Sequence, residues 1–230
     1  MSKTSNSTQS RATASRAPVG LTEGQIIAAA MEVLESDGLD KLSLRAVAAK
    51  LGVRVNAVAW HLKDKAGLLS TVADAMVADC VPAHLPPDPE ERVRTLLASL
   101  RTALLSHRDG ARLAREGSSL ARTHQRAFAE AFNAALHATG RSPKEAAWTA
   151  WTLMYFTLGL VKEEQTPQSR TLYAEAAEAD PAAFPSLAKT IAHLRPDSFD
   201  DRFAYGVDLI LSGHSSVPPT PRPATGPATE

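Results

Sequence analysis

Residues 42–68 contain two short helical patterns separated by a glycine, and this arrangement limits what the chain can fold into. The second pattern runs from Val53 to Leu62, and Gly52 supplies the tight turn before it. Two helices joined in this way form a helix-turn-helix, whose second helix can enter the major groove of DNA. The same arrangement also occurs as a plain structural corner. In the first pattern the apolar positions at helical spacing are Leu44, Val47, Ala48 and Leu51.

The side chains of the second pattern favour DNA binding over a structural corner. Arg54 and Asn56 stand at its start, where a groove-reading helix meets base edges. Arginine suits guanine and asparagine suits adenine. Residues that can approach phosphates follow at the far end: Trp60, His61, Lys63 and Lys65.

An amphipathic helix is predicted upstream over residues 21–35, with Thr22 as its N-cap. Its apolar face would complete a three-helix core. That face consists of Ile26, Ile27, Ala30, Val33 and Leu34.

Beyond residue 65 the patterns predict helices only, so the expected fold class is all-α. We expect a helix-turn-helix domain over residues 21–68 and a helical regulatory and dimerisation domain over 69–213, between disordered tails at 1–20 and 214–230. The predicted helices cover residues 65–80, 89–106, a short stretch from 109, 122–139, 143–164, 181–193 and 199–212, with a loop at 166–180.

The charges are balanced overall, with 25 Lys and Arg against 25 Asp and Glu. Up to Lys65, however, the chain has nine basic and six acidic residues, which makes the N-terminal part the candidate DNA end.

The single cysteine, Cys80, excludes an intrachain disulfide and fits a reducing compartment, where it would be a small buried hydrophobe. Neither a signal peptide nor a membrane span is indicated, so we expect a cytoplasmic protein without a membrane partner.

In the region of the predicted helix-turn-helix the chain resembles the tetracycline-repressor (TetR) family of bacterial transcription regulators. The similarity runs from IIAAAMEVLESDGLDKLSLRAVAAKLGV through WHLKDKAGLL, across the whole expected DNA-binding domain. ALLSHRDGARL, FTLGLVKEEQ and FAYGVDLILSG further resemble the regulatory domain of the tetracycline repressors themselves.

The resemblance implies a set of DNA contacts. Where the family usually has a tyrosine beside its aromatic-histidine pair, this chain has Ala59, so one phosphate contact is expected to be missing. Val55 could meet a thymine methyl or could be packing. The expected DNA-binding residues are Ser43 and Arg45 at phosphate and an outer base, Arg54, Val55 and Asn56 on the reading face, and Trp60, His61 and Lys65 at the backbone.

The effector site departs from the tetracycline repressors. Their metal-binding histidine corresponds to Ala114 here, their long-helix pocket histidine to Tyr155, and their drug-anchoring asparagine to Leu96. Only Glu163 matches a residue that serves the water shell of the metal. We therefore expect no metal or other cofactor, and an inducer other than tetracycline.

Aromatic and aliphatic side chains replace those polar groups and predict a hydrophobic, aromatic effector such as an antibiotic or polyketide. Tyr155 would be its hydrogen-bonding anchor. The alternative is that these side chains only fill the core of a domain without an inducer. The expected lining consists of Leu96, Leu100, Phe128, Phe132, Trp148, Trp151 and Tyr155, with Glu163 nearby.

The helices over residues 143–164 and 199–212 are apolar over most of their circumference. They could form a subunit interface or be buried core helices. The resemblance implies that they pack against their twofold mates as a four-helix bundle, which makes the protein a homodimer that reads a palindromic operator. The expected interface residues are Leu153, Phe156, Leu160, Phe203, Val207, Leu209, Ile210 and Leu211.

These features predict a ligand-released repressor, with a transcriptional activator or a ligand-independent DNA-binding protein as the alternatives. An enzyme is not expected, because no HExxH, CxxC, glycine-rich phosphate loop or nucleophile elbow occurs. His107, Arg108 and Asp109 are expected to position a helix junction. Coupling between the domains is expected to pass through the helix over residues 65–80.

Overall fold

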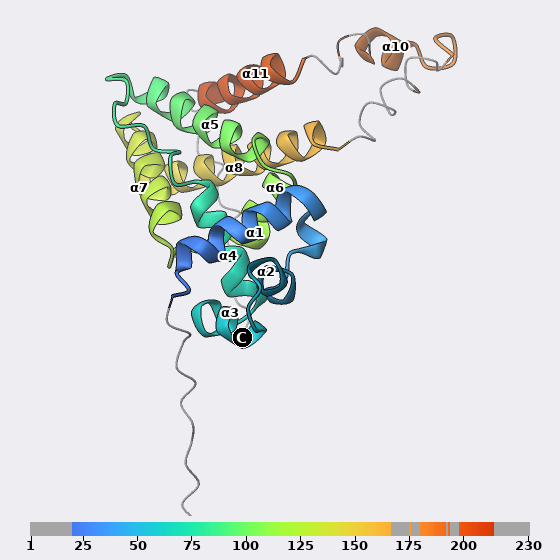
Figure 1. Ribbon diagram of the computed structural model, residues 1–230. Helices are drawn as coiled ribbons and strands as arrows, with labels where there is room; N and C mark the ends of the chain where they lie inside the picture. Colours follow the sequence, from blue (N-terminus) through green and yellow to red (C-terminus); the bar gives the residue numbers. More distant parts are fainter. Residues whose placement is uncertain (1–19, 167–174, 176–179, 192, 194–197, 214–230) are drawn as a thin grey trace, which may run out of the picture.

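The computed structural model describes residues 20–166, 175, 180–191, 193 and 198–213. Across these residues the secondary structure is helical, without a strand (Figure 1), which confirms the all-α prediction. The expected tails and most of the 166–180 loop lie outside the described residues. The elements are α1 (Glu23–Asp37), the 3₁₀ helix η1 (Leu39–Lys41), α2 (Leu44–Leu51), α3 (Val55–Leu62), α4 (Lys65–Met76), α5 (Pro89–Leu105), α6 (Gly110–Glu116), α7 (Thr123–Ala138), α8 (Pro143–Glu164), α10 (Pro185–Ile191) and α11 (Phe199–Ser212).

Helix α1 begins where the sequence predicts. Thr22 Oγ1 accepts the backbone N–H of Gln25 at 3.2 Å, and Gln25 Oε1 accepts the backbone N–H of Thr22 at 2.8 Å. This capping box satisfies donors that the first turn leaves unpaired. The helix ends at Gly38, whose φ of 82° favours glycine.

Helix α4 joins the two halves of the molecule. It packs against α1 and α3 of the N-terminal half and against α6 and α7 of the C-terminal half (Figure 1). The helix ends at Met76, four residues earlier than predicted, because the chain turns at Val77. Val77 and Cys80 are still buried, which explains why their apolar pattern extends the helical signal.

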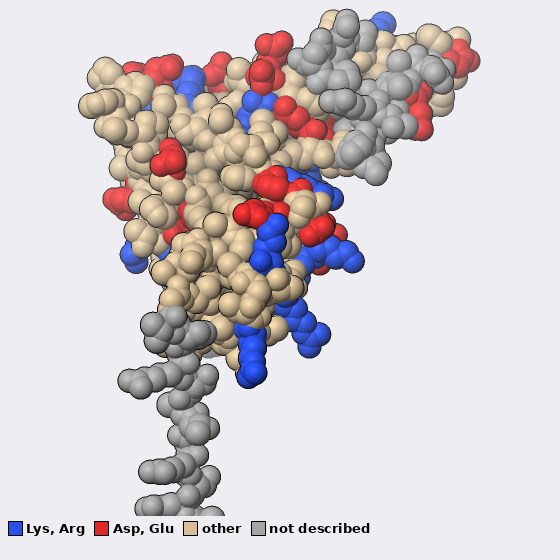
Figure 2. Space-filling view, in the orientation of Figure 1, with Lys and Arg blue, Asp and Glu red and all other residues tan. Residues whose placement is uncertain are grey.

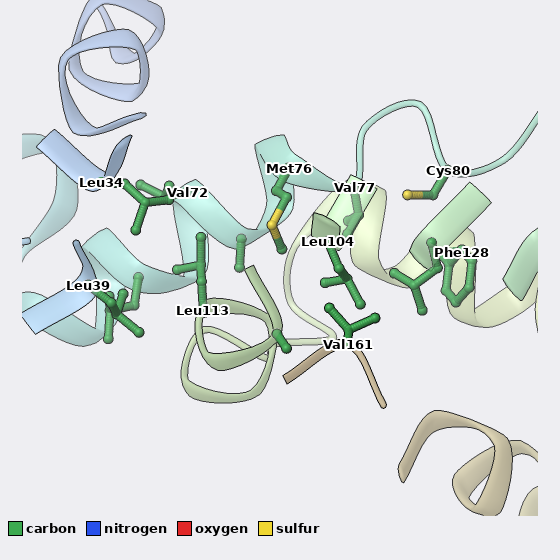
Figure 3. Packing of buried hydrophobic residues seen from close by; sticks show 14 of the residues in the cluster. Leu34, Leu39, Val72, Met76, Val77, Cys80, Leu104, Leu113, Phe128 and Val161 are labelled. Carbon is green, nitrogen blue, oxygen red and sulfur yellow. The ribbon is translucent and has the colours of Figure 1, made fainter. Parts of the chain in front are cut away.

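One hydrophobic cluster runs through both halves. Figure 3 shows side chains of α4, α5, α6 and α8 within it, among them Met76, Leu104, Leu113 and Val161. Cys80 is buried in this cluster as predicted, and its Sγ lies 3.8 Å from the carbonyl oxygen of Ser99. Burial raises the pKa of the Cys80 thiol to about 11, so the group is an unreactive thiol at neutral pH.

The C-terminal helices follow the predicted starts with one exception. Asp88 caps α5 and Ser142 caps α8 through their side chains, each just before a proline. The helix predicted from residue 181 begins only at Pro185. None of the residues of α10 is buried, and Figure 1 shows this helix away from the rest of the chain. No helix within the described ranges combines the length and apolar character that a membrane crossing needs.

The close contact between α4 and the end of α6 can be tested at Gly117. A Cβ there would lie 2.4 Å from Leu69 O and 2.7 Å from Ala73 Cβ. Gly117→Ala should therefore lower the free energy of unfolding by about 2–3 kcal/mol, measured by denaturant titration. Gly24→Ala is the control, because a Cβ at Gly24 meets nothing within 4 Å. It should leave stability unchanged or raise it by up to about 1 kcal/mol. Equal stability of the two variants would contradict the close contact.

Candidate nucleic-acid interface and regulatory core

The turn between α2 and α3 sets the orientation of the candidate reading helix. Gly52 ends α2 in the left-handed conformation, with φ 67° and ψ 26°. Helix α3 then buries Ala57, Val58 and Leu62. The opposite side of α3 is exposed to solvent, and its outward residues include the predicted reading residues Arg54, Val55, Asn56 and Trp60.

The predicted base-reading and phosphate cations are available for a ligand. Arg45, Arg54 and Lys65 are exposed, and within the described residues none has an ion pair or a side-chain hydrogen bond. Figure 2 shows Lys and Arg side chains protruding at the lower end of the molecule, where Figure 1 places α2 and α3. On this face the Asp and Glu side chains gather higher up. Arg45, Arg54 and Lys65 therefore present positive charge that no ion pair within the described residues neutralises, whereas Lys50 of α2 pairs with Glu32 at 2.7 Å.

Three residues predicted to contact DNA already make contacts within the chain, which limits the atoms that they can present to DNA. Ser43 caps α2, accepting the backbone N–H of Ala46 at 3.2 Å, so its hydroxyl is left to donate. Trp60 is 57 % exposed, and its ring meets the His61 ring edge to face, with centroids 4.9 Å apart. The Nε2 atom of His61 is buried without a hydrogen-bond partner. A phosphate would therefore have to meet Nδ1 of His61 in this conformation.

The residues predicted to line the effector pocket separate into two groups. Leu96, Leu100, Phe128 and Phe132 are buried between α5 and α7, and the two phenylalanine rings stack with centroids 5.7 Å apart. The three aromatic residues of α8 point away from this core: Trp148, Trp151 and Tyr155 are 64, 60 and 66 % exposed. Tyr155 therefore does not line the core between α5 and α7, and its role as an effector anchor stays a prediction. Helical periodicity identifies apolar positions but does not say which neighbouring helix covers them.

Most of the residues predicted for the subunit interface are instead covered within the single chain. Leu153, Leu160, Val207 and Leu211 are buried within the single chain, where α8 packs against α11. Phe156 and Phe203 stack there with centroids 6.2 Å apart, and Ile210 also packs against the core. Of the predicted set only Leu209 is largely exposed, at 61 %.

Glu163 belongs to the contact between α8 and α11. Arg202 donates to both of its carboxylate oxygens, at 3.0 and 3.1 Å. Because a bidentate guanidinium pair is directional, it fixes the end of α8 against α11. The predicted effector role of Glu163 is therefore not supported, since its carboxylate is engaged within the chain.

A polar junction joins α1 to the turn between α5 and α6. His107 Nδ1 lies 2.9 Å from Glu35 Oε1, and the backbone N–H of Arg108 donates to Glu35 Oε2 at 3.1 Å. The Arg108 side chain donates to Ser36 O at 2.7 Å. The sequence predicted a positioning role for these residues, but nothing in it identified α1 as their partner.

The same junction continues to η1. Asp109 Oδ2 accepts the backbone N–H of Leu39 at 2.9 Å, and Arg112 pairs with Asp40 at 2.8 Å. The hydrogen bond and the charge of Arg112 lower the pKa of Asp40 below its ordinary value.

A second polar junction joins α4 to the start of α7. The backbone N–H of Gln125 donates to Asp74 Oδ1 at 2.9 Å. Its side-chain amide donates to Ser70 O at 3.3 Å and to Gly117 O at 3.2 Å. Arg122 adds a bond to Ser70 Oγ at 3.2 Å. One glutamine thus ties together α4, the end of α6 and α7.

Family comparison covers both halves of the chain. Residues 26–72 match the family described as bacterial regulatory proteins, tetR family, and residues 83–217 match the tetracyclin repressor-like C-terminal domain. The chain belongs to the TetR family. Members of this family are DNA-binding transcription factors rather than enzymes, and the chain is a TetR-family transcription regulator with a helix-turn-helix.

Individual relatives cover nearly the whole of the described fold. The chain is 32 % identical to the class G tetracycline repressor protein of Vibrio anguillarum over 197 residues, which covers 84 % of this chain and 93 % of the relative. The Streptomyces coelicolor TetR-family protein ActR, solved with (S)-DNPA, is 26 % identical with a TM-score of 0.74, covering 84 and 96 % of the two chains. BioQ, solved with its double-stranded DNA operator, is 25 % identical with a TM-score of 0.66, covering 86 and 99 %.

Arg54 provides a direct test of the reading face of this TetR-family regulator. Arg54→Ala should weaken binding to a selected operator duplex by about 1–3 kcal/mol and relax the preference at one base position. Fluorescence anisotropy with matched and single-substituted duplexes measures both effects. Arg115→Ala is the control, because Arg115 is an equally exposed arginine on α6. An operator affinity that both variants share with the unmodified protein would remove Arg54 from the reading face.

Proposed function

We propose that this TetR-family regulator is a homodimeric repressor of the bacterial cytoplasm that binds a palindromic operator when empty and releases it when a hydrophobic, aromatic small molecule binds. Residues 21–68 would read DNA, and residues 69–213 would hold the effector and the second subunit. The observation that carries the proposal is the outward face of α3, where Arg54, Val55 and Asn56 are exposed on a helix-turn-helix. A buried structural corner would not leave these groups in water.

The homodimer is proposed on the exposed apolar face of α8 and α11. Trp148, Trp151 and Tyr155 lie on this face, and α11 adds Tyr205 and Leu209, which are 70 and 61 % exposed. Large apolar side chains gathered on two adjacent helices indicate an interface. A twofold contact would bury this face against its own copy and bring two reading helices to roughly 34–36 Å spacing.

The deciding experiment is selection of bound sequences from random duplex DNA by the full chain. An enriched inverted repeat, bound with a steep salt dependence, is the expected result. Enrichment of a single half-site would overturn the dimeric reading mode, and no enrichment at low salt would overturn the repressor proposal.

Trp151→Glu should convert the dimer to a monomer, because it places a charge at the centre of the apolar face. Light scattering should show half the mass of the unmodified protein, and the variant should lose the inverted repeat. Leu120→Glu is the matched control, since Leu120 is 67 % exposed but lies outside α8 and α11. A dimer that persists in Trp151→Glu would place the interface elsewhere.

The effector proposal rests on the buried core between α5, α7 and α8. The similar protein ActR has also been solved in complex with actinorhodin, which supports an aromatic effector for this chain. Leu96, Leu100, Phe128 and Phe132 would line the site. Thr157 is a better anchor than Tyr155, because it is fully buried on α8 and its hydroxyl has no hydrogen-bond partner among the described residues. A buried hydroxyl without a partner favours a ligand that supplies one.

Release would pass through α4, which joins the two halves. The side-chain amide of Gln125 links α4 to α7, the helix that carries Phe128 and Phe132. An effector that separates α5 from α7 would therefore pull α4. Release requires the ligand to prefer the conformation that does not bind the operator. The coupling free energy between two such sites is usually about 1–3 kcal/mol.

Thr157→Val tests the proposed anchor, with actinorhodin as the probe. The variant should be as stable as the unmodified protein or more stable by about 1 kcal/mol, because it removes an unpaired buried hydroxyl. It should also need a higher actinorhodin concentration to release DNA. Thr71→Val is the control, since Thr71 is equally buried but donates to Gly67 O at 2.8 Å. That variant should lose about 1 kcal/mol of stability and keep the actinorhodin response. An unchanged response in Thr157→Val would exclude Thr157 as the anchor.

A further inference from the structure

The turn between α3 and α4 contains one of the two non-glycine residues with positive φ in the described part of the chain. Lys63 has φ 64° and ψ −67°, and the N–H of Asp64 donates to Leu62 O across it at 2.8 Å. This is a γ-turn with positive φ at its centre, which is rare and strained for a residue that carries a Cβ. The other described non-glycine residue with positive φ, Asp109, lies in the ordinary left-handed region, with ψ 22°.

The surrounding contacts hold Lys63 in this conformation. Its own N–H donates to Ala59 O at 2.8 Å and closes α3, while Asp64 Oδ1 accepts the N–H of Gly67 at 2.8 Å and opens α4. Leu62 O packs so close to Gly67 that a Cβ there would lie 1.9 Å from it. The two helices are therefore fixed on both sides of one residue. Glycine would fit this position without strain, yet the chain has lysine.

The lysine side chain has no structural role that would explain its presence. Lys63 is exposed, and in the part of the chain that is described it forms no ion pair or side-chain hydrogen bond. Its neighbour Asp64 uses a carboxylate oxygen to cap α4, so the two charges are not paired with each other. Lys63 is the C-cap residue of α3 and stands in the sequence between His61 and Lys65. Figure 1 places α3 at the end of the molecule where Figure 2 shows Lys and Arg side chains protruding.

We infer that Lys63 is a DNA-backbone contact held by a strained turn, so that this position trades folding stability for a phosphate-binding cation. The inference rests on the proposed operator binding. The sequence already places Lys63 among residues that can approach phosphates, and the turn geometry now gives this residue a role that is separable from base reading. A phosphodiester is the ligand that fits, because a flexible ammonium at the end of a reading helix recognises charge and not base edges.

Three substitutions separate the charge from the strain. Lys63→Ala removes the charge and keeps the Cβ, Lys63→Gly removes both, and Lys63→Arg keeps both. Melting temperature and affinity for the selected operator are measured between 50 and 200 mM salt on the full chain. Lys189→Ala on α10 is the control for loss of one exposed lysine elsewhere.

We expect Lys63→Ala and Lys63→Gly to flatten the plot of log affinity against log salt by the same amount. One phosphate per subunit corresponds to a change of about 1.8 for a dimer, so the deficit of either variant should grow about tenfold between 200 and 50 mM salt. Lys63→Gly alone should raise the melting temperature, by several degrees. Lys63→Arg and Lys189→Ala should match the unmodified protein in both measurements.

Two results would overturn the inference. A salt dependence in Lys63→Ala equal to that of the unmodified protein would show that the lysine does not meet DNA. A Lys63→Gly variant that melts no higher than Lys63→Ala would show that the turn stores no strain. Failure of the proposed operator binding is distinguishable from both, because the unmodified protein would then select no duplex.

Discussion

The close approach of α4 to its neighbours is the constraint on which the rest of the structure depends. At Gly67 the helix lies against the carbonyl of Leu62 at the end of α3, and at Gly117 the end of α6 lies against the carbonyl of Leu69 on α4. Both contacts exclude a Cβ, so the first turns of α4 are fixed between the reading helix and the regulatory core. Packed interiors shift between discrete arrangements and do not deform continuously. A movement of α6 that carries α4 with it therefore also moves α3.

Two polar junctions add to this close packing and hold the DNA-reading end against the core at separate places. The turn after α5 holds α1 through Glu35 and Asp109, while Gln125 holds α4 through Ser70 and Asp74. These two junctions attach different helices of the DNA-reading end to different helices of the core. If only one junction existed, the reading end could pivot about it. With both junctions present, a movement of the core helices is passed on to α1 and α4, each through its own junction.

The sequence predicted the features that local chemistry determines. The helix starts after Thr22 and Ser142 follow from capping chemistry, and the start at Pro89 follows from the fixed φ of proline. The exposed face of α3 follows from the position of its apolar residues. Which apolar side chains of α8 are buried was not predictable. Trp151 and Leu153 are both apolar, and only the positions of the helices that pack against α8 decide which one is covered. Likewise, the strain at Lys63 leaves no sequence signal, since lysine is ordinary in a turn and glycine would have been the informative residue.

The packed core has a consequence for how an effector could act. Leu96, Phe128 and Phe132 fill the space between α5 and α7, so a ligand that enters there must bind a conformation in which these helices have separated. Its apparent affinity is then reduced by the fraction of molecules in the open state. In the proposed mechanism operator binding favours the closed state, and it then weakens ligand binding by the same factor by which the ligand weakens operator binding. A filled core is therefore compatible with the proposed effector site, and in that proposal the free energy needed to open the core is what couples the site to DNA.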